Sequence, residues 1–121
     1  MDWTAEDTRE VARRRLKKEA ERQHALEQRR IAAQAHATQL AQEIGEADTT
    51  VRRIWGFGSV FDQRLNFREG SDIDLAVQGG SLRAWKLAQQ SEWQIDWVEL
   101  DDQDESMARS IQASGVVLYE R

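Results

Sequence analysis

The feature that most constrains the fold is a long segment, residues 4–44, that contains neither proline nor glycine. It consists mainly of Ala, Glu, Gln, Arg, Lys and Leu, which are the strongest helix formers. The segment therefore predicts one continuous helix with a length of about 60 Å. Thr4 followed by Asp7 has the pattern of an N-terminal cap, and Gly45 is expected to end the helix.

The two halves of this helix differ in apolar content. In the second half, apolar residues recur at steps of three, four and seven and form one narrow stripe: Leu26, Ala33, Ala37, Leu40 and Ile44. The first half has only Trp3, Val11 and Leu16 as sizeable apolar side chains. We expect the second half to pack on the rest of the chain, and the first half to extend into solvent or to contact a partner.

Charge is unevenly distributed along the chain. Residues 1–30 hold nine basic and seven acidic side chains, and the remainder holds eight basic and fifteen acidic ones, for a net charge of −5. The basic run at residues 13–18 is compatible with nucleic-acid binding. Acidic residues on the same helix offer ion-pair partners to it: Glu10, Glu19, Glu21 and Glu27. We interpret the run as a solvated helix face and do not expect direct nucleic-acid binding.

Composition excludes several kinds of site. The chain has no cysteine, which rules out disulfides, thiolate catalysis and Cys-bound metals. Its two histidines, His24 and His36, are too far apart in sequence to share one helix face as metal ligands. We find no apolar run long enough to span a bilayer and no secretion signal, so we expect a cytoplasmic protein without a membrane segment.

After the long helix, the pattern changes to short strands. Four segments are rich in alternating apolar, β-branched or aromatic residues: 51–57, 73–77, 93–98 and 116–119. Two segments with helical spacing lie between them: 82–91 and 101–114. This order predicts an α+β fold, in which a small mixed β-sheet carries helices on one face and is preceded by the long helix. We divide the chain into residues 1–45, the charged helix, and residues 46–121, the domain.

Three acidic residues lie at or within apolar strands. Asp72 and Asp74 are expected on one face because residues two apart share a face, and Asp96 lies within a different strand. If these strands are neighbours, three carboxylates converge, and their mutual repulsion favours a bound cation. Magnesium suits such a site because it takes carboxylates together with substrate phosphates. Two such ions can serve phosphoryl or nucleotidyl transfer.

Gly58 and Ser59 follow the first predicted strand and could seat a phosphate, since glycine lets the backbone approach closely. A Gly-Ser pair alone is usually a turn, and an isolated Asp-x-Asp is often a solvated strand edge. The combination of Gly58-Ser59, Asp72-x-Asp74 and Asp96 is more specific and favours a catalytic site.

At these positions the chain resembles the minimal nucleotidyltransferases (MNT), a small branch of the DNA polymerase β-like superfamily. The resemblance covers about residues 40–121 and rests on three segments: 55–59, 66–77 and 94–100. It implies a polymerase β-like nucleotidyltransferase fold in residues 46–121. It also implies that Asp72, Asp74 and Asp96 are catalytic ligands of two Mg²⁺ ions, and that Gly58 and Ser59 bind ATP.

The loop after Ser59 departs from the family pattern. Many members have Ala-Arg-Gly shortly after Gly-Ser, whereas this chain has Val60-Phe61-Asp62-Gln63-Arg64. Arg64 is the candidate to replace the family arginine.

The resemblance also implies a partner. Small members of this family typically act with an all-helical HEPN-class protein, often a ribonuclease toxin, and silence it as antitoxins by transferring AMP from ATP to a tyrosine. We therefore predict AMP transfer to a HEPN partner, with Asp96 helping to deprotonate or position the tyrosine hydroxyl. The alternatives are an antitoxin that masks its partner sterically without catalysis, and nucleotidyl transfer to a small-molecule acceptor.

Overall fold

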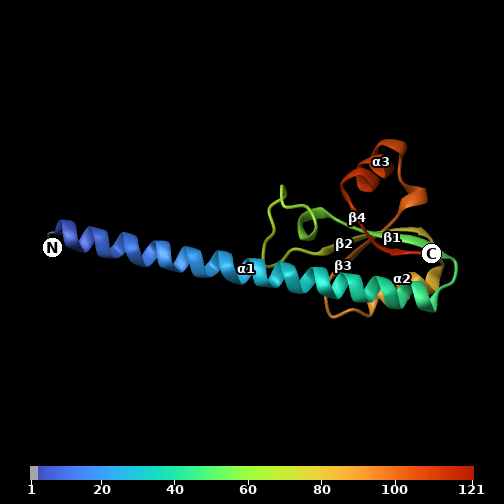
Figure 1. The fold of residues 1–121 in the computed structure, drawn as a ribbon, viewed down its shortest axis with the longest axis horizontal. Coiled ribbons are helices and arrows are strands. Elements are labelled where there is room, and N and C mark those ends of the chain that lie inside the picture. The colour runs from blue at the N-terminus through green and yellow to red at the C-terminus, as the bar shows by residue number, and fades with distance from the viewer. Residues whose placement is uncertain (1–2) are drawn as a thin grey trace.

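The computed structural model describes residues 3–121, which form one long helix and a small sheet with two short helices (Figure 1). The elements follow one another as α1 (Ala5–Ala47), β1 (Val51–Phe57), β2 (Ile73–Gly79), α2 (Leu82–Gln89), β3 (Ile95–Glu99), α3 (Glu105–Ser114) and β4 (Val116–Glu120). Two 3₁₀ turns, Gly58–Val60 and Leu100–Asp102, follow β1 and β3. No helix in this part of the chain has both the length and the apolar character needed to cross a membrane.

Helix α1 has 43 residues, or about 64 Å. The expected N-terminal cap is present: the backbone N–H of Asp7 donates to Thr4 Oγ1, and the backbone N–H of Thr4 donates to Asp7 Oδ2, both at 3.1 Å. The expected end at Gly45 is wrong, because α1 continues to Ala47 and is capped by Asp48. Gly45 instead lies under the ring of Tyr119, where any larger side chain would collide with that ring.

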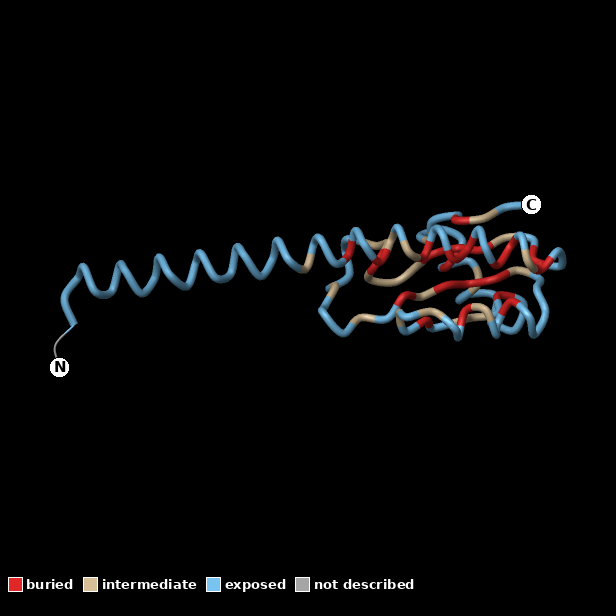
Figure 2. The backbone as a smooth tube through the Cα atoms, turned by 90° about the horizontal axis from the view of Figure 1, so that it is seen from below, coloured by how far each residue is buried: buried red, intermediate tan, exposed pale blue. Residues whose placement is uncertain are grey.

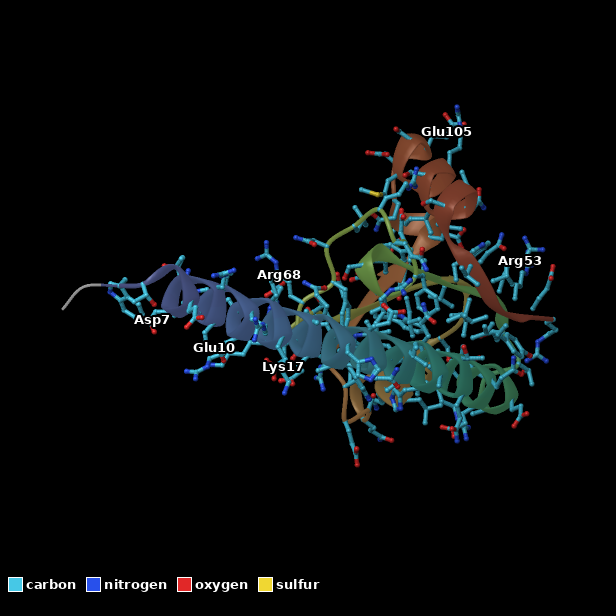
Figure 3. The ribbon with its side chains drawn as sticks, turned by 60° about the vertical axis from the view of Figure 1, so that its left-hand side comes forward. Asp7, Glu10, Lys17, Arg53, Arg68 and Glu105 are labelled. Atoms are coloured by element: carbon cyan, nitrogen blue, oxygen red, sulfur yellow. The ribbon has the colours of Figure 1, made fainter. Side chains whose placement is uncertain are left out.

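The N-terminal half of α1 is an arm that projects away from the sheet. Residues 3–25 are all exposed, and Leu26 is the first half-buried position (Figure 2). Figure 3 shows Asp7, Glu10 and Lys17 along this arm, with their side chains in solvent. From residue 30 onward, buried positions recur on one side of the helix: Arg30, Ala33, Ala37, Leu40, Ala41, Ile44 and Gly45. The division into a solvent-exposed and a packed half is therefore confirmed.

The sheet has the order β3-β2-β1-β4. Strand β1 is antiparallel to β2 and to β4, whereas β2 and β3 are parallel and are joined through α2. A parallel pair needs such a crossover, which here is the short helix α2. The expected α+β class and mixed sheet are confirmed.

The helices cover both faces of the sheet rather than the single face that we expected. Helices α1 and α2 enclose the main core with side chains such as Ile54, Leu75 and Val77. Helix α3 lies on the opposite face, where Ile111 packs with Trp55 and Ala76. Successive residues of a strand point to opposite faces of the sheet, so the side chains of Ile54 and Trp55 are buried only if helices pack on both faces. Both faces of the central strands are thereby shielded from water.

Candidate active site

Gly58 lies at the end of β1, directly against the carboxylate of Asp74. Its φ of +73° belongs to the left-handed region that glycine adopts most easily. A Cβ built at this position would collide with Asp74 Oδ2. The glycine is therefore required twice, once by its backbone conformation and once by the close approach of the carboxylate.

Asp74 and Asp96 are direct neighbours across the parallel pair β2 and β3. They alternate with core residues that face α1, so both carboxyl groups lie on the α3 face of the sheet. Asp74 is half-buried and Asp96 is exposed. Burial, followed by the charge and the hydrogen bond of Asp96 and the charge of Asp72, raises the pKa of Asp74 to about 7. The sequence prediction that these carboxyl groups face one another is thus realised for Asp74 and Asp96.

Asp72 is exposed and precedes β2 rather than lying within it. Its charge acts on Asp74, but within residues 3–121 no three His, Cys, Asp or Glu side chains are grouped closely enough to enclose a metal ion. The donor set consists of carboxylate oxygens, which magnesium prefers. Repulsion at Asp74 is what a cation would relieve. The residues therefore fit a cation held by Asp74 and Asp96, with Asp72 nearby.

Ser59 follows Gly58 in the first 3₁₀ turn and is half-buried. Arg64, the candidate for the family arginine, points to its own loop instead. Its guanidinium forms two hydrogen bonds with Asp62, from Nε at 3.0 Å and from Nη2 at 2.9 Å, and its side chain is 79% exposed. The Arg64 guanidinium in turn holds the pKa of Asp62 below its usual range.

Two cavities lie along α1, and neither is lined by Asp74 or Asp96. One cavity of 440 Å³ lies between α1 and the loop after the first 3₁₀ turn, and Arg30 and Phe67 help to line it. Another of 350 Å³ includes Asp72, together with Arg29 and Trp93. The α1 residues were not foreseen as part of the site. The sequence signal that could have identified them is that they are polar side chains next to the apolar stripe of a helix expected to pack on the sheet.

Comparison with known proteins finds the same fold in solved structures. No protein-family model and no curated protein sequence matches the chain. A crystal structure of "the toxin-antitoxin with AMP-PNP" has a TM-score of 0.56 and 20% identity, covering 69% of this chain and 73% of the other. A mutant of the toxin-antitoxin MntA-HpeT has a TM-score of 0.52 and 20% identity, with coverage of 65% and 69%.

A third match is a tri-AMPylated Shewanella oneidensis HEPN toxin in complex with an MNT antitoxin. Its TM-score is 0.50 at 19% identity, with coverage of 76% of this chain and 73% of the other. The TM-scores of 0.50–0.56 indicate a common fold, and at identities near 20% the likeness shows the fold alone. The chain therefore shares the α+β architecture of MNT antitoxins from HEPN toxin–antitoxin pairs.

Proposed function

We propose that this protein is a magnesium-dependent nucleotidyltransferase that acts as an antitoxin by transferring AMP from ATP to a tyrosine of a helical HEPN toxin. The observation that carries the proposal is that Asp74 lies against Gly58 and is paired with Asp96 on the neighbouring strand. This arrangement supports the proposal because carboxylates beside a phosphate-binding turn can hold the metal ions that assist nucleotidyl transfer.

The similar structures support the nucleotide and the partner. One contains AMP-PNP, and another contains an AMPylated HEPN toxin bound to an MNT antitoxin. The MntA-HpeT structure is a mutant in which two aspartates two positions apart are replaced by glutamate. Asp72 and Asp74 have the same spacing in this chain.

Each candidate residue would have its own role in the reaction. Gly58 and Ser59 would hold the triphosphate, and Asp72, Asp74 and Asp96 would hold the metal. Magnesium, when bound, would neutralise charge on the triphosphate and on the pyrophosphate that leaves. The tyrosine oxygen would attack the α-phosphorus as the bond to pyrophosphate breaks. Asp96, which is exposed, would orient that hydroxyl and accept its proton.

The test uses ATP labelled at the α-phosphate, Mg²⁺ and, as the candidate partner, a HEPN-class protein encoded beside this one. We expect the label on a tyrosine of that protein, and no label with EDTA or with Asp74→Asn. Binding without labelling, accompanied by inhibition of the partner, would instead indicate steric masking. Labelling of an added small molecule but not of the partner would indicate a small-molecule acceptor.

A further inference from the structure

One short stretch of α1, residues 29–36, contacts the Gly58–Val60 turn and the segments that precede β2 and β3. Gln34 makes the first contact. Its Nε2 donates to the carbonyl oxygen of Val60 at 2.7 Å. Val60 is the last residue of the 3₁₀ turn that begins with Gly58 and Ser59. The helix thereby holds the turn proposed to bind the triphosphate.

Arg29 makes the second contact and reaches both acid-bearing segments at once. Its Nε donates to the carbonyl oxygen of Glu69 at 3.0 Å, three residues before Asp72. Its guanidinium carbon lies 4.5 Å from the centroid of the Trp93 ring, three residues before Asp96. One planar group thus spans the loop before β2 and the segment before β3.

A third contact secures the segment before β3. His36 Nε2 lies 2.7 Å from the hydroxyl oxygen of Ser91, and that oxygen accepts the backbone N–H of Trp93 at 3.1 Å. Trp93 is therefore held through its ring by Arg29 and through its backbone by Ser91.

These anchors matter because the loop before β2 has little structure of its own. Residues 63–66 and 68–70 are exposed and form neither helix nor strand. Exposed loops move unless something holds them. Displacing a catalytic group by about 1 Å can reduce a rate by about 100-fold. Two hydrogen bonds between Arg68 and Ser71 form a turn within the loop, and Arg29 adds the contact that fixes where this turn lies against α1.

We infer that Arg29 and Gln34 are positioning residues of this site, with Arg29 setting the acid-bearing segments and Gln34 setting the Gly58–Val60 turn. The kinetic part of this inference rests on the proposed function. The structural part concerns the order of the segments and can be measured on the free protein.

Two substitutions separate the two roles. Arg29→Met keeps the apolar stem of an exposed side chain but loses the guanidinium. We expect AMP transfer to slow by about tenfold and AMP-PNP affinity to change by less than about twofold, because the triphosphate turn keeps its anchor. For Gln34→Met, which loses the bond to Val60, we expect the reverse: AMP-PNP affinity falls by about fivefold or more, since one hydrogen bond is lost.

Arg29→Lys distinguishes positioning from simple attraction between charges. Lysine keeps the positive charge but cannot both stack flat on Trp93 and donate to the Glu69 carbonyl as a guanidinium does. We expect Arg29→Lys to transfer AMP about as slowly as Arg29→Met. Wild-type transfer by the lysine variant would overturn the assignment, because charge alone would then suffice.

Hydrogen exchange on the free protein provides a readout that is independent of activity. In Arg29→Met we expect amides in residues 62–72 and 91–95 to exchange at least about fivefold faster. Arg83→Met, which removes an exposed guanidinium from α2, serves as the matched control and should leave both segments unchanged. If the wild type transfers no AMP, the proposed function fails, and exchange together with AMP-PNP binding still decides this inference. Unchanged exchange in Arg29→Met would overturn it.

Discussion

Asp48 joins three elements of the fold, and its removal should cost a measurable part of the stability. The side chain is 4% exposed. Oδ1 accepts the backbone N–H of Thr50 at 3.0 Å and its hydroxyl at 2.5 Å. Oδ2 accepts the backbone N–H of Ser81 at 2.9 Å and its hydroxyl at 2.7 Å. The end of α1, the start of β1 and the N-cap of α2 therefore meet at one carboxylate.

The substitution Asp48→Asn keeps the shape but turns one oxygen into an amide nitrogen. Two of the four hydrogen-bond donors around this side chain then face the amide nitrogen, which is itself a donor. The hydroxyl can rotate and accept a hydrogen bond from the amide, whereas the backbone N–H loses its acceptor. Because hydrogen bonds to a charged group contribute about 1.5–3 kcal/mol each and an orphaned buried donor costs about 1–3 kcal/mol, we expect a loss of about 2–4 kcal/mol at pH 7. A small domain has about 5–15 kcal/mol in total, so the variant should still fold.

The pH dependence provides a sharper test. Burial alone would raise the pKa of Asp48, but the hydrogen bonds from Thr50 and Ser81 outweigh burial and hold that pKa well below its usual range. An acid with a depressed native pKa contributes stability above its unfolded pKa, which is 3.8 here, and loses it as the pH falls toward the native pKa. Between pH 5 and pH 3 the wild type should lose about 1 kcal/mol that Asp48→Asn does not lose.

Urea unfolding followed by tryptophan fluorescence at pH 7, 5 and 3 measures both effects. Glu46→Gln, which removes an exposed charge near the same helix end, is the matched control and should lie within about 0.5 kcal/mol of the wild type at pH 7. A stability gap between wild type and Asp48→Asn that is equal at pH 5 and pH 3 would refute the reasoning, because the carboxylate would then not be the group that titrates.

Three further predictions concern the site and the arm. Asp74→Asn should reduce AMP transfer by about 100-fold or more without lowering the thermal midpoint in EDTA, because the half-buried carboxylate that faces Asp96 is removed; a large drop in midpoint would contradict this. Gly58→Ala should lower the stability by at least about 1 kcal/mol and also weaken AMP-PNP binding in calorimetry, because its φ is +73° and a Cβ would meet Asp74. Deleting residues 1–25, which are exposed wherever the structure describes them, should leave the sheet folded by circular dichroism. The same deletion should weaken binding to the proposed HEPN partner, and added salt should also weaken the binding of the intact protein. Equal affinity with and without the arm would place recognition on the sheet domain.

Local sequence patterns were sufficient to predict the helices and strands, but not how these elements are arranged in space. The helix formers of α1 and the β-branched segments of the strands determine type and approximate position through local chemistry alone. Which face α3 covers depends on how the chain turns after β3, and this is not a local property. A signal was nevertheless present: Ile54 and Trp55 are adjacent apolar residues of one strand, and both are buried. A strand with apolar residues on both faces predicts cover on both sides.

The prediction of the site was also limited, because local sequence patterns do not show which strands pair with one another. Asp74 and Asp96 were expected to meet only if their strands were neighbours, and the parallel register of β2 and β3 meets that condition. Arg29 and Gln34 could not be assigned from sequence, because their partners are backbone carbonyl oxygens of Glu69 and Val60. A carbonyl oxygen is present at every position, so no residue type reveals which one accepts a long-range hydrogen bond.

The fold explains why Gly58 and Asp74, which are far apart in the sequence, belong to one site. In the sequence, glycine suggested a backbone that can approach a phosphate. In the fold, the same glycine lies against the carboxylate of Asp74, because Phe57, the residue before it, pairs with Asp74 across β1 and β2. A nucleotide held by the turn would therefore have its phosphates next to the carboxylates without any further movement of the chain. The two short patterns are informative together because the antiparallel register makes them one surface, and a change of two residues in that register would move Asp74 away from Gly58 while leaving both patterns intact in the sequence.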